Sequence, residues 1–128
     1  MKKTIYVMVL AFIAGGLREF LVLMTGSYQN IAITLINILG SFLLAFLIPL
    51  LPTLKASDEL ISGVSLGFIG SFTTFSTFVM QSILLFNNHK VLSILFFLGN
   101  LIGGFIADII GRKLADNLLA KNGEEVVK

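Results

Sequence analysis

Four long apolar runs, separated by short polar segments, dominate the chain. The runs cover residues 4–24, 31–51, 60–86 and 91–111, and charged side chains gather near their ends. A helix needs about 20 apolar residues to cross the hydrocarbon core of a bilayer. Each run has about that length, so the pattern predicts an all-α integral membrane protein. The connecting segments are short, and we expect residues 1–128 to form a single four-helix transmembrane domain.

The composition also favours a lipid environment. Of the 128 residues, 56% are hydrophobic and only 12% are charged, whereas a soluble domain has about 25% charged residues. The chain has no cysteine, and its single histidine, His89, falls in a polar turn. The sequence therefore offers no thiolate metal site and no nucleophile–base pair, and we expect no enzymatic activity.

Four spans place both termini on the same side of the membrane. Lysine and arginine are in slight excess near the membrane ends on that side, which favours a cytoplasmic location for the termini in the cell inner or plasma membrane. The excess is about three charges, small enough to be compatible with insertion in either orientation. A bundle of only four helices encloses little room for a path across the membrane, so we expect the functional unit to be a dimer.

Small residues spaced four apart occur in two spans. They are Gly63 with Gly67, and Gly99 with Gly103. This spacing lets two helix backbones approach closely. The sequence leaves open whether these pairs pack within one chain or between two.

Polar residues within the spans are functional candidates, because burying them in a membrane is costly. Asn37 and Ser41 are four residues apart and share a helix face, and Asn100 lies in the fourth span. Each is either a hydrogen-bonding link between helices or part of a polar path. Arg18 and Glu19 lie near the end of the first span, where they fit an interfacial anchor better than a substrate-coupling carboxylate.

The third span carries the most informative segment, residues 67–78 (GFIGSFTTFSTF). Glycine loosens the backbone, and serine and threonine hydroxyls compete for its hydrogen bonds. We therefore expect a break at Gly70–Thr73, since a Ser/Thr-rich helix with hydroxyls bonded to its own carbonyls is the weaker alternative. A half-helix that begins after the break directs its positive end at an anion, while unwound carbonyls suit a cation. The positive ring edges of Phe75 and Phe78 suit a small anion as well, although aromatic residues at this spacing usually pack.

The same residues resemble the Fluc/CrcB family of fluoride channels. The resemblance rests on residues 67–78 and on the segment NILGSF at 37–42, with weaker support from AGGLR at 14–18. It implies an antiparallel, dual-topology homodimer with two fluoride pores and a structural Na⁺ at the centre of its interface. It also implies passive export of cytoplasmic fluoride, which relieves fluoride toxicity.

The resemblance also assigns residues to the site. It places five residues in the fluoride pore, namely Phe75, Phe78, Asn37, Ser76 and Thr77. Arg18 matches a vestibule arginine, and Gly70 and Thr73 match residues whose backbone carbonyls bind the sodium. Ser41, Gln81 and Asn100 are further polar candidates: Gln81 stands where the family often has glutamate, and Asn100 is the nearest polar residue to a common fourth-span serine.

Two other functions remain open. A small multidrug-type proton-coupled transporter is also a four-helix, dual-topology dimer, but it requires a lone membrane carboxylate, for which the chain offers only Glu19 beside Arg18. A non-transporting structural subunit has no need of the polar segment in the third span.

Overall fold

The structure is a computed structural model that describes residues 1–121. All regular secondary structure within that range is helical. The elements in chain order are α1 (Lys2–Met24), a 3₁₀ turn (Gly26–Tyr28), α2 (Gln29–Leu50), α3 (Asp58–Ser62), a π-helical segment (Gly63–Ile69), α4 (Gly70–Phe72), α5 (Phe75–Asn88) and α6 (Lys90–Lys121). Residues 122–128 of the predicted domain lie outside the described residues.

Four helical stretches are long and apolar enough to cross a membrane. They are Lys2–Met24, Gly26–Leu50, Asp58–Asn88 and Lys90–Lys121. These stretches contain the four apolar runs almost entirely, so the prediction of four transmembrane helices is confirmed. Their outer faces are apolar and exposed, as in Phe12, which is 85% exposed. Such apolar faces are suited to contact with the hydrocarbon of a lipid bilayer.

The helix boundaries follow from local chemistry. Ser57 caps α3, because its Oγ accepts a hydrogen bond from the Leu60 N–H at 3.3 Å, and Asp58 and Glu59 occupy the first turn. Serine is a favoured N-cap residue, and the acidic side chains lie at the positive end of the helix. At the other boundary, α2 continues through Pro49 and ends at Leu50, one residue before the predicted end of the span.

The last helix is longer than the apolar run that predicts it. The run ends at residue 111, but α6 continues to Lys121. Ala115 and Leu119 are four residues apart and buried, at 0% and 2% exposure. The polar extension is therefore amphipathic, and its apolar stripe still packs against the rest of the chain.

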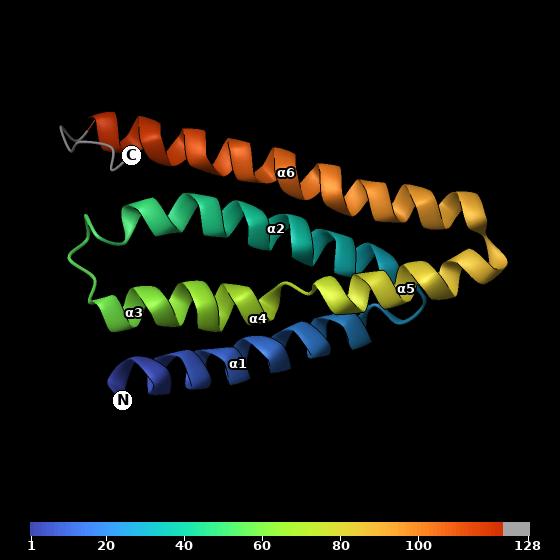
Figure 1. The fold of residues 1–128 in the computed structure, drawn as a ribbon, viewed down its shortest axis with the longest axis horizontal. Coiled ribbons are helices and arrows are strands. Elements are labelled where there is room, and N and C mark those ends of the chain that lie inside the picture. The colour runs from blue at the N-terminus through green and yellow to red at the C-terminus, as the bar shows by residue number, and fades with distance from the viewer. Residues whose placement is uncertain (122–128) are drawn as a thin grey trace.

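The start of α1 and the end of α6 lie at the same end of the bundle, as an even number of spans requires (Figure 1). The helix α2 lies between α6 and the row formed by α3, α4 and α5, and α1 lies on the far side of that row. The π-helical segment, α3 and α4 pack against α1, whereas α5 packs against α6. The third stretch thus changes partner between α4 and α5.

The contact with α1 depends on glycine. A Cβ added at Gly67 would lie 2.6 Å from the backbone oxygen of Val7, and one at Gly63 would lie 2.9 Å from a methyl group of Leu10. Gly63 and Gly67 therefore serve packing within the chain. Of the other predicted pair, a Cβ added at Gly103 would lie 2.7 Å from a methyl group of Ile38, while a Cβ added at Gly99 would have no atom within 4 Å.

Candidate functional site

The backbone leaves the helical conformation at two residues between α4 and α5. Thr73 has φ −76° and ψ 150°, and Thr74 has φ −146° and ψ 110°. The Thr73 N–H and hydroxyl both donate to the Ile69 carbonyl, at 3.0 Å each. Thr74 caps α5, since its Oγ1 accepts from the Thr77 N–H at 3.2 Å. The extended residues adjoin the segment in which the sequence predicts a break, while Gly70 itself is helical.

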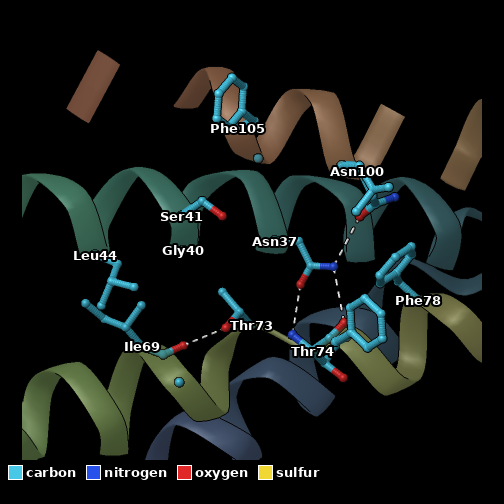
Figure 2. A pocket seen from close by; sticks show the side chains of 14 residues that line it. Asn37, Gly40, Ser41, Leu44, Ile69, Thr73, Thr74, Phe78, Asn100 and Phe105 are labelled. Carbon is cyan, nitrogen blue, oxygen red and sulfur yellow. Dashed lines mark hydrogen bonds between the residues drawn. The ribbon is translucent and has the colours of Figure 1, made fainter. Parts of the chain in front are cut away.

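Asn37 of α2 occupies the gap that these extended residues leave in the backbone hydrogen bonding (Figure 2). Its Oδ1 accepts from the Thr74 N–H at 2.8 Å, and its Nδ2 donates to the Thr74 carbonyl at 3.2 Å. The same Nδ2 donates to Oδ1 of Asn100 on α6 at 3.1 Å. One side-chain amide thus satisfies both backbone groups of Thr74 within the membrane, where an unpaired group is costly.

We call Thr73 and Thr74, which connect α4 to α5, the junction. An open groove of about 320 Å³ runs beside it, between α2, the third helical stretch and α6. Its lining residues carry no charged side chain; they are Asn37, Gly40, Ser41, Leu44, Ile69, Gly70, Thr73, Thr74, Phe75, Phe78, Asn100, Leu101, Gly104 and Phe105. Figure 2 shows that Asn37, Ser41 and Thr73 approach this space from α2 and from the end of α4. The groove is apolar with a band of amides and hydroxyls, so it offers hydrogen-bonding groups but no full charge.

Phe75 and Phe78 lie at the α5 end of the groove. Their ring centroids are 5.1 Å apart with an interplanar angle of 79°, an edge-to-face arrangement. Such a pair presents the positive edge of one ring beside the face of the other. Phe78 is 3% exposed and packs on Phe96 and Phe97 of α6, whereas Phe75 is 70% exposed.

A second, smaller cavity of about 110 Å³ lies between α1, α2 and α5. Arg18, Glu19, Thr77 and Gln81 are among its lining residues. The Nη1 of Arg18 donates to the Ser71 carbonyl at 3.2 Å. Thr74 lines both this cavity and the groove. The junction between α4 and α5 is thus the wall that the two spaces share.

The structure distributes the predicted site residues between these two spaces. Those in the groove are Asn37, Ser41, Gly70, Thr73, Phe75, Phe78 and Asn100, and those in the cavity are Arg18, Thr77 and Gln81. Ser76 lies in neither and is exposed.

Sequence reasoning missed Thr34. Its hydroxyl oxygen accepts a hydrogen bond from Asn100 Nδ2 at 2.9 Å. The sequence spacing could have identified it, because Thr34 precedes Asn37 by three residues and therefore lies on the same helix face as Asn37 and Ser41.

The carbonyl groups of Gly70 and Thr73 lie next to hydrogen-bond donors that point elsewhere. In a regular helix they would accept from the N–H groups of Thr74 and Thr77. Here the Thr74 N–H donates to Asn37 Oδ1, and the Thr77 N–H donates to Thr74 Oγ1. Across residues 1–121, no group of three or more His, Cys, Asp or Glu side chains is placed to hold a metal ion.

The comparison with known proteins identifies the family. Residues 5–112 match the family profile described as CrcB-like protein, Camphor Resistance (CrcB). The chain belongs to the CrcB family. No solved structure gives a significant match.

Curated relatives of this CrcB chain are named as fluoride-specific ion channels. The protein FluC 1 of one Bacillus cereus strain is 39% identical, with 95% of both chains covered. FluC 2 of Listeria innocua is 37% identical over 95% of this chain and 97% of the relative. FluC 2 of Lactiplantibacillus plantarum is 41% identical over 94% of this chain and 98% of the relative.

These matches confirm the resemblance found in the sequence. Together with the four helices able to cross a membrane, they make the chain a multi-pass protein of the bacterial plasma membrane. The activity named for the relatives is ion conduction rather than catalysis.

Proposed function

We propose that this CrcB protein is a fluoride-selective channel for passive export of cytoplasmic fluoride. The observation that carries the proposal is the uncharged polar junction at Thr74, bordered by a groove with the Phe75–Phe78 pair, in a chain whose relatives are named as fluoride-specific channels. Such a channel relieves fluoride toxicity by letting the ion leave down its gradient.

The chemistry of the site suits a small, strongly hydrated anion. Conduction requires several weak sites, so that the ion both enters and leaves. Here α5 begins at Phe75, and the positive end of its dipole faces the junction. Hydroxyl groups and aromatic ring edges supply further partial positive charge. The groove lining contains no lysine or arginine, so no full positive charge holds the ion there.

The two spaces take different roles in this proposal. The cavity of Arg18, Thr77 and Gln81 is the vestibule, where the arginine attracts anions. The groove of Asn37, Phe75 and Phe78 is the pore wall. Ser76, which lies on α5 and is exposed in the single chain, also belongs to the pore in this proposal. An ion passes from one to the other over Thr74, which lines both.

The functional unit in this proposal is an antiparallel dimer of chains inserted in opposite orientations, with two pores. The groove is open along one side, and Phe75 is 70% exposed in the single chain. A second copy placed against this face closes the groove and covers the phenylalanine. The interruption at Thr73–Thr74 then lies in the middle of the membrane as a break in the third helix.

A structural Na⁺ at the dimer interface belongs to the same proposal. Unwound backbone carbonyls are sodium ligands in membrane proteins, and the carbonyls of Gly70 and Thr73 are adjacent to N–H groups that are bonded to side chains instead. Both residues line the open groove. These two carbonyls from each copy would hold the ion, which would supply positive charge that binds the two chains together.

A proton-coupled transporter of the small multidrug type is the second candidate. Its only support in the site is Glu19, which lines the cavity beside Arg18. A Glu19→Gln variant separates the two functions, because a coupled transporter loses activity with its carboxylate and a channel retains ion flux.

The decisive measurement is anion efflux from liposomes that contain the purified protein. We expect fluoride efflux at a rate far above that of chloride, driven by the fluoride gradient alone. Equal fluoride and chloride efflux, or no fluoride efflux from a correctly folded protein, contradicts the proposal. Protein-free liposomes give the background leak.

A further inference from the structure

The side-chain amide of Asn37 has no N–H left for an ion. A primary amide carries two N–H donors and one carbonyl oxygen. Its two donors go to the Thr74 carbonyl at 3.2 Å and to Asn100 Oδ1 at 3.1 Å, and its oxygen accepts from the Thr74 N–H at 2.8 Å. A flipped amide would place its oxygen against the Thr74 carbonyl, so the hydrogen bonds fix the orientation drawn in Figure 2.

The side-chain amide of Asn100 also has its donors occupied by hydrogen bonds within the chain. It is 5% exposed, and its Nδ2 donates to Thr34 Oγ1 and to the Phe96 carbonyl, at 2.9 Å each. The Thr34 hydroxyl in turn donates to the Asn30 carbonyl at 2.9 Å. A continuous series of hydrogen bonds therefore runs from α2 to α6, back to α2, and on to the backbone of Thr74.

Thr34 stands at the outer end of this series. It lines a different groove, of about 480 Å³, between the start of α2 and the start of α6, together with Ile31, Leu35 and Leu92. It is absent from the lining of both the Thr74 groove and the Arg18 cavity. Thr34 therefore lines neither of the spaces assigned to the ion, and its hydrogen bond with Asn100 connects it to them.

We propose that Thr34 and Asn100 are positioning residues, which hold the Asn37 amide on the peptide group of Thr74 and thereby fix the shape of the ion path. This inference rests on the proposed channel function. In this proposal Asn37 does not donate a hydrogen bond to the ion. Its role is to hold the Thr74 peptide in place. The hydrogen bonds to the ion then come from groups outside the two amides, such as the hydroxyls of Ser41 and Thr77, which line the groove and the cavity.

The physical reason is the cost of an unpaired polar group in the membrane. If Asn100 loses the Thr34 oxygen, one of its N–H groups needs another acceptor, and the amide rotates away from Asn37. Asn37 then loses one of the two groups that hold its Nδ2. The Thr74 peptide, which is extended and outside any helix, is thereby released.

The test uses the full-length protein in liposomes and the substitution Thr34→Val, which keeps the side-chain shape and removes the acceptor. We expect fluoride efflux to fall about three- to tenfold, the size expected from one interhelical hydrogen bond in a membrane. Thr34→Ser restores the hydroxyl and should restore efflux to nearly the wild-type rate. The matched control is Thr25→Val, because the Thr25 hydroxyl donates only to the Val22 carbonyl, at 2.6 Å.

Two readouts separate positioning from a loss of folded protein. The first is the ratio of fluoride to chloride efflux, which a smaller amount of active protein leaves unchanged and which a displaced Thr74 lowers. The second is a double-mutant cycle with Asn100→Leu. If Thr34 acts through Asn100, adding Thr34→Val to Asn100→Leu produces little further loss.

A Thr34→Val protein with wild-type efflux and selectivity overturns the positioning role. So does an independent, multiplicative loss in the double mutant. Failure of the proposed function gives a different result, namely a wild-type protein that does not pass fluoride in preference to chloride.

Discussion

Phe75 and Phe78 meet edge to face at 5.1 Å, yet one ring is 70% exposed and the other 3% exposed. Phe78 is held by its own chain, since it packs on Phe96 and Phe97. Phe75 has one fixed aromatic neighbour within the described chain and otherwise faces outward. The pair therefore combines a rigid ring with one whose environment depends on what covers the groove.

This difference predicts distinct effects of two isoleucine substitutions. Phe78→Ile removes packing on α6, and we expect it to lower the unfolding free energy by about 1–3 kcal/mol and to reduce fluoride efflux. Phe75→Ile should reduce efflux with a smaller loss of stability. Thermal unfolding in detergent and liposome efflux measure the two effects. The control is Phe12→Ile, which changes an exposed ring on α1; undiminished efflux in both Phe75→Ile and Phe78→Ile contradicts their assignment to the pore.

Gly40 on α2 provides a second prediction, because a Cβ added there would overlap the methyl group of Thr73. Thr73 is short and β-branched, and its hydroxyl is bonded to the Ile69 carbonyl, so it has little freedom to move aside. Overpacking of this kind costs about 1–3 kcal/mol. We expect Gly40→Ala to displace the junction and to lower fluoride efflux about tenfold.

The matched control for this substitution is Gly99→Ala on α6. No atom lies within 4 Å of a Cβ added at Gly99, and alanine favours the helix. We expect wild-type efflux from this variant. Equal efflux from the Gly40 and Gly99 variants shows that contact between α2 and Thr73 does not matter for conduction.

Arg18 gives a prediction that depends on ionic strength. Its guanidinium lines the small cavity and donates to the Ser71 carbonyl at 3.2 Å. We expect Arg18→Gln to reduce efflux most at low fluoride and low salt, because attraction of anions by an accessible charge is screened by salt. Arg18→Lys retains the charge and should retain most of the efflux at low salt. A Gln variant whose deficit is the same at all salt concentrations contradicts a role in attracting anions.

The proposed sodium site is tested by replacing the cation. If the carbonyls of Gly70 and Thr73 bind Na⁺ as proposed, exchange of Na⁺ for a large organic cation at constant ionic strength should lower the thermal stability of the purified protein. Restoring Na⁺ should restore it. A melting temperature that does not depend on Na⁺ over the whole titration contradicts the site.

Much of the architecture could be predicted from the sequence because it depends on local properties. The four apolar runs determine the membrane spans, and Ser57 caps the third stretch as its position before Asp58 and Glu59 indicates. For the Ser/Thr-rich segment, the sequence predicts a break at Gly70–Thr73. Local patterns located it less exactly, because the helix persists through Gly70–Phe72 and the extended residues are Thr73 and Thr74.

The sequence by itself determined that the protein resides in lipid, how many spans it has and which polar residues lie within those spans. Only the tertiary structure decided which of those residues meet. It placed Asn37 on the Thr74 peptide, Asn100 on Asn37 and Thr34 on Asn100, and it assigned Gly63 and Gly67 to packing against α1. The physical reason is that burial of an apolar run depends on its own composition, whereas a hydrogen-bond partner in a membrane depends on which helices lie side by side.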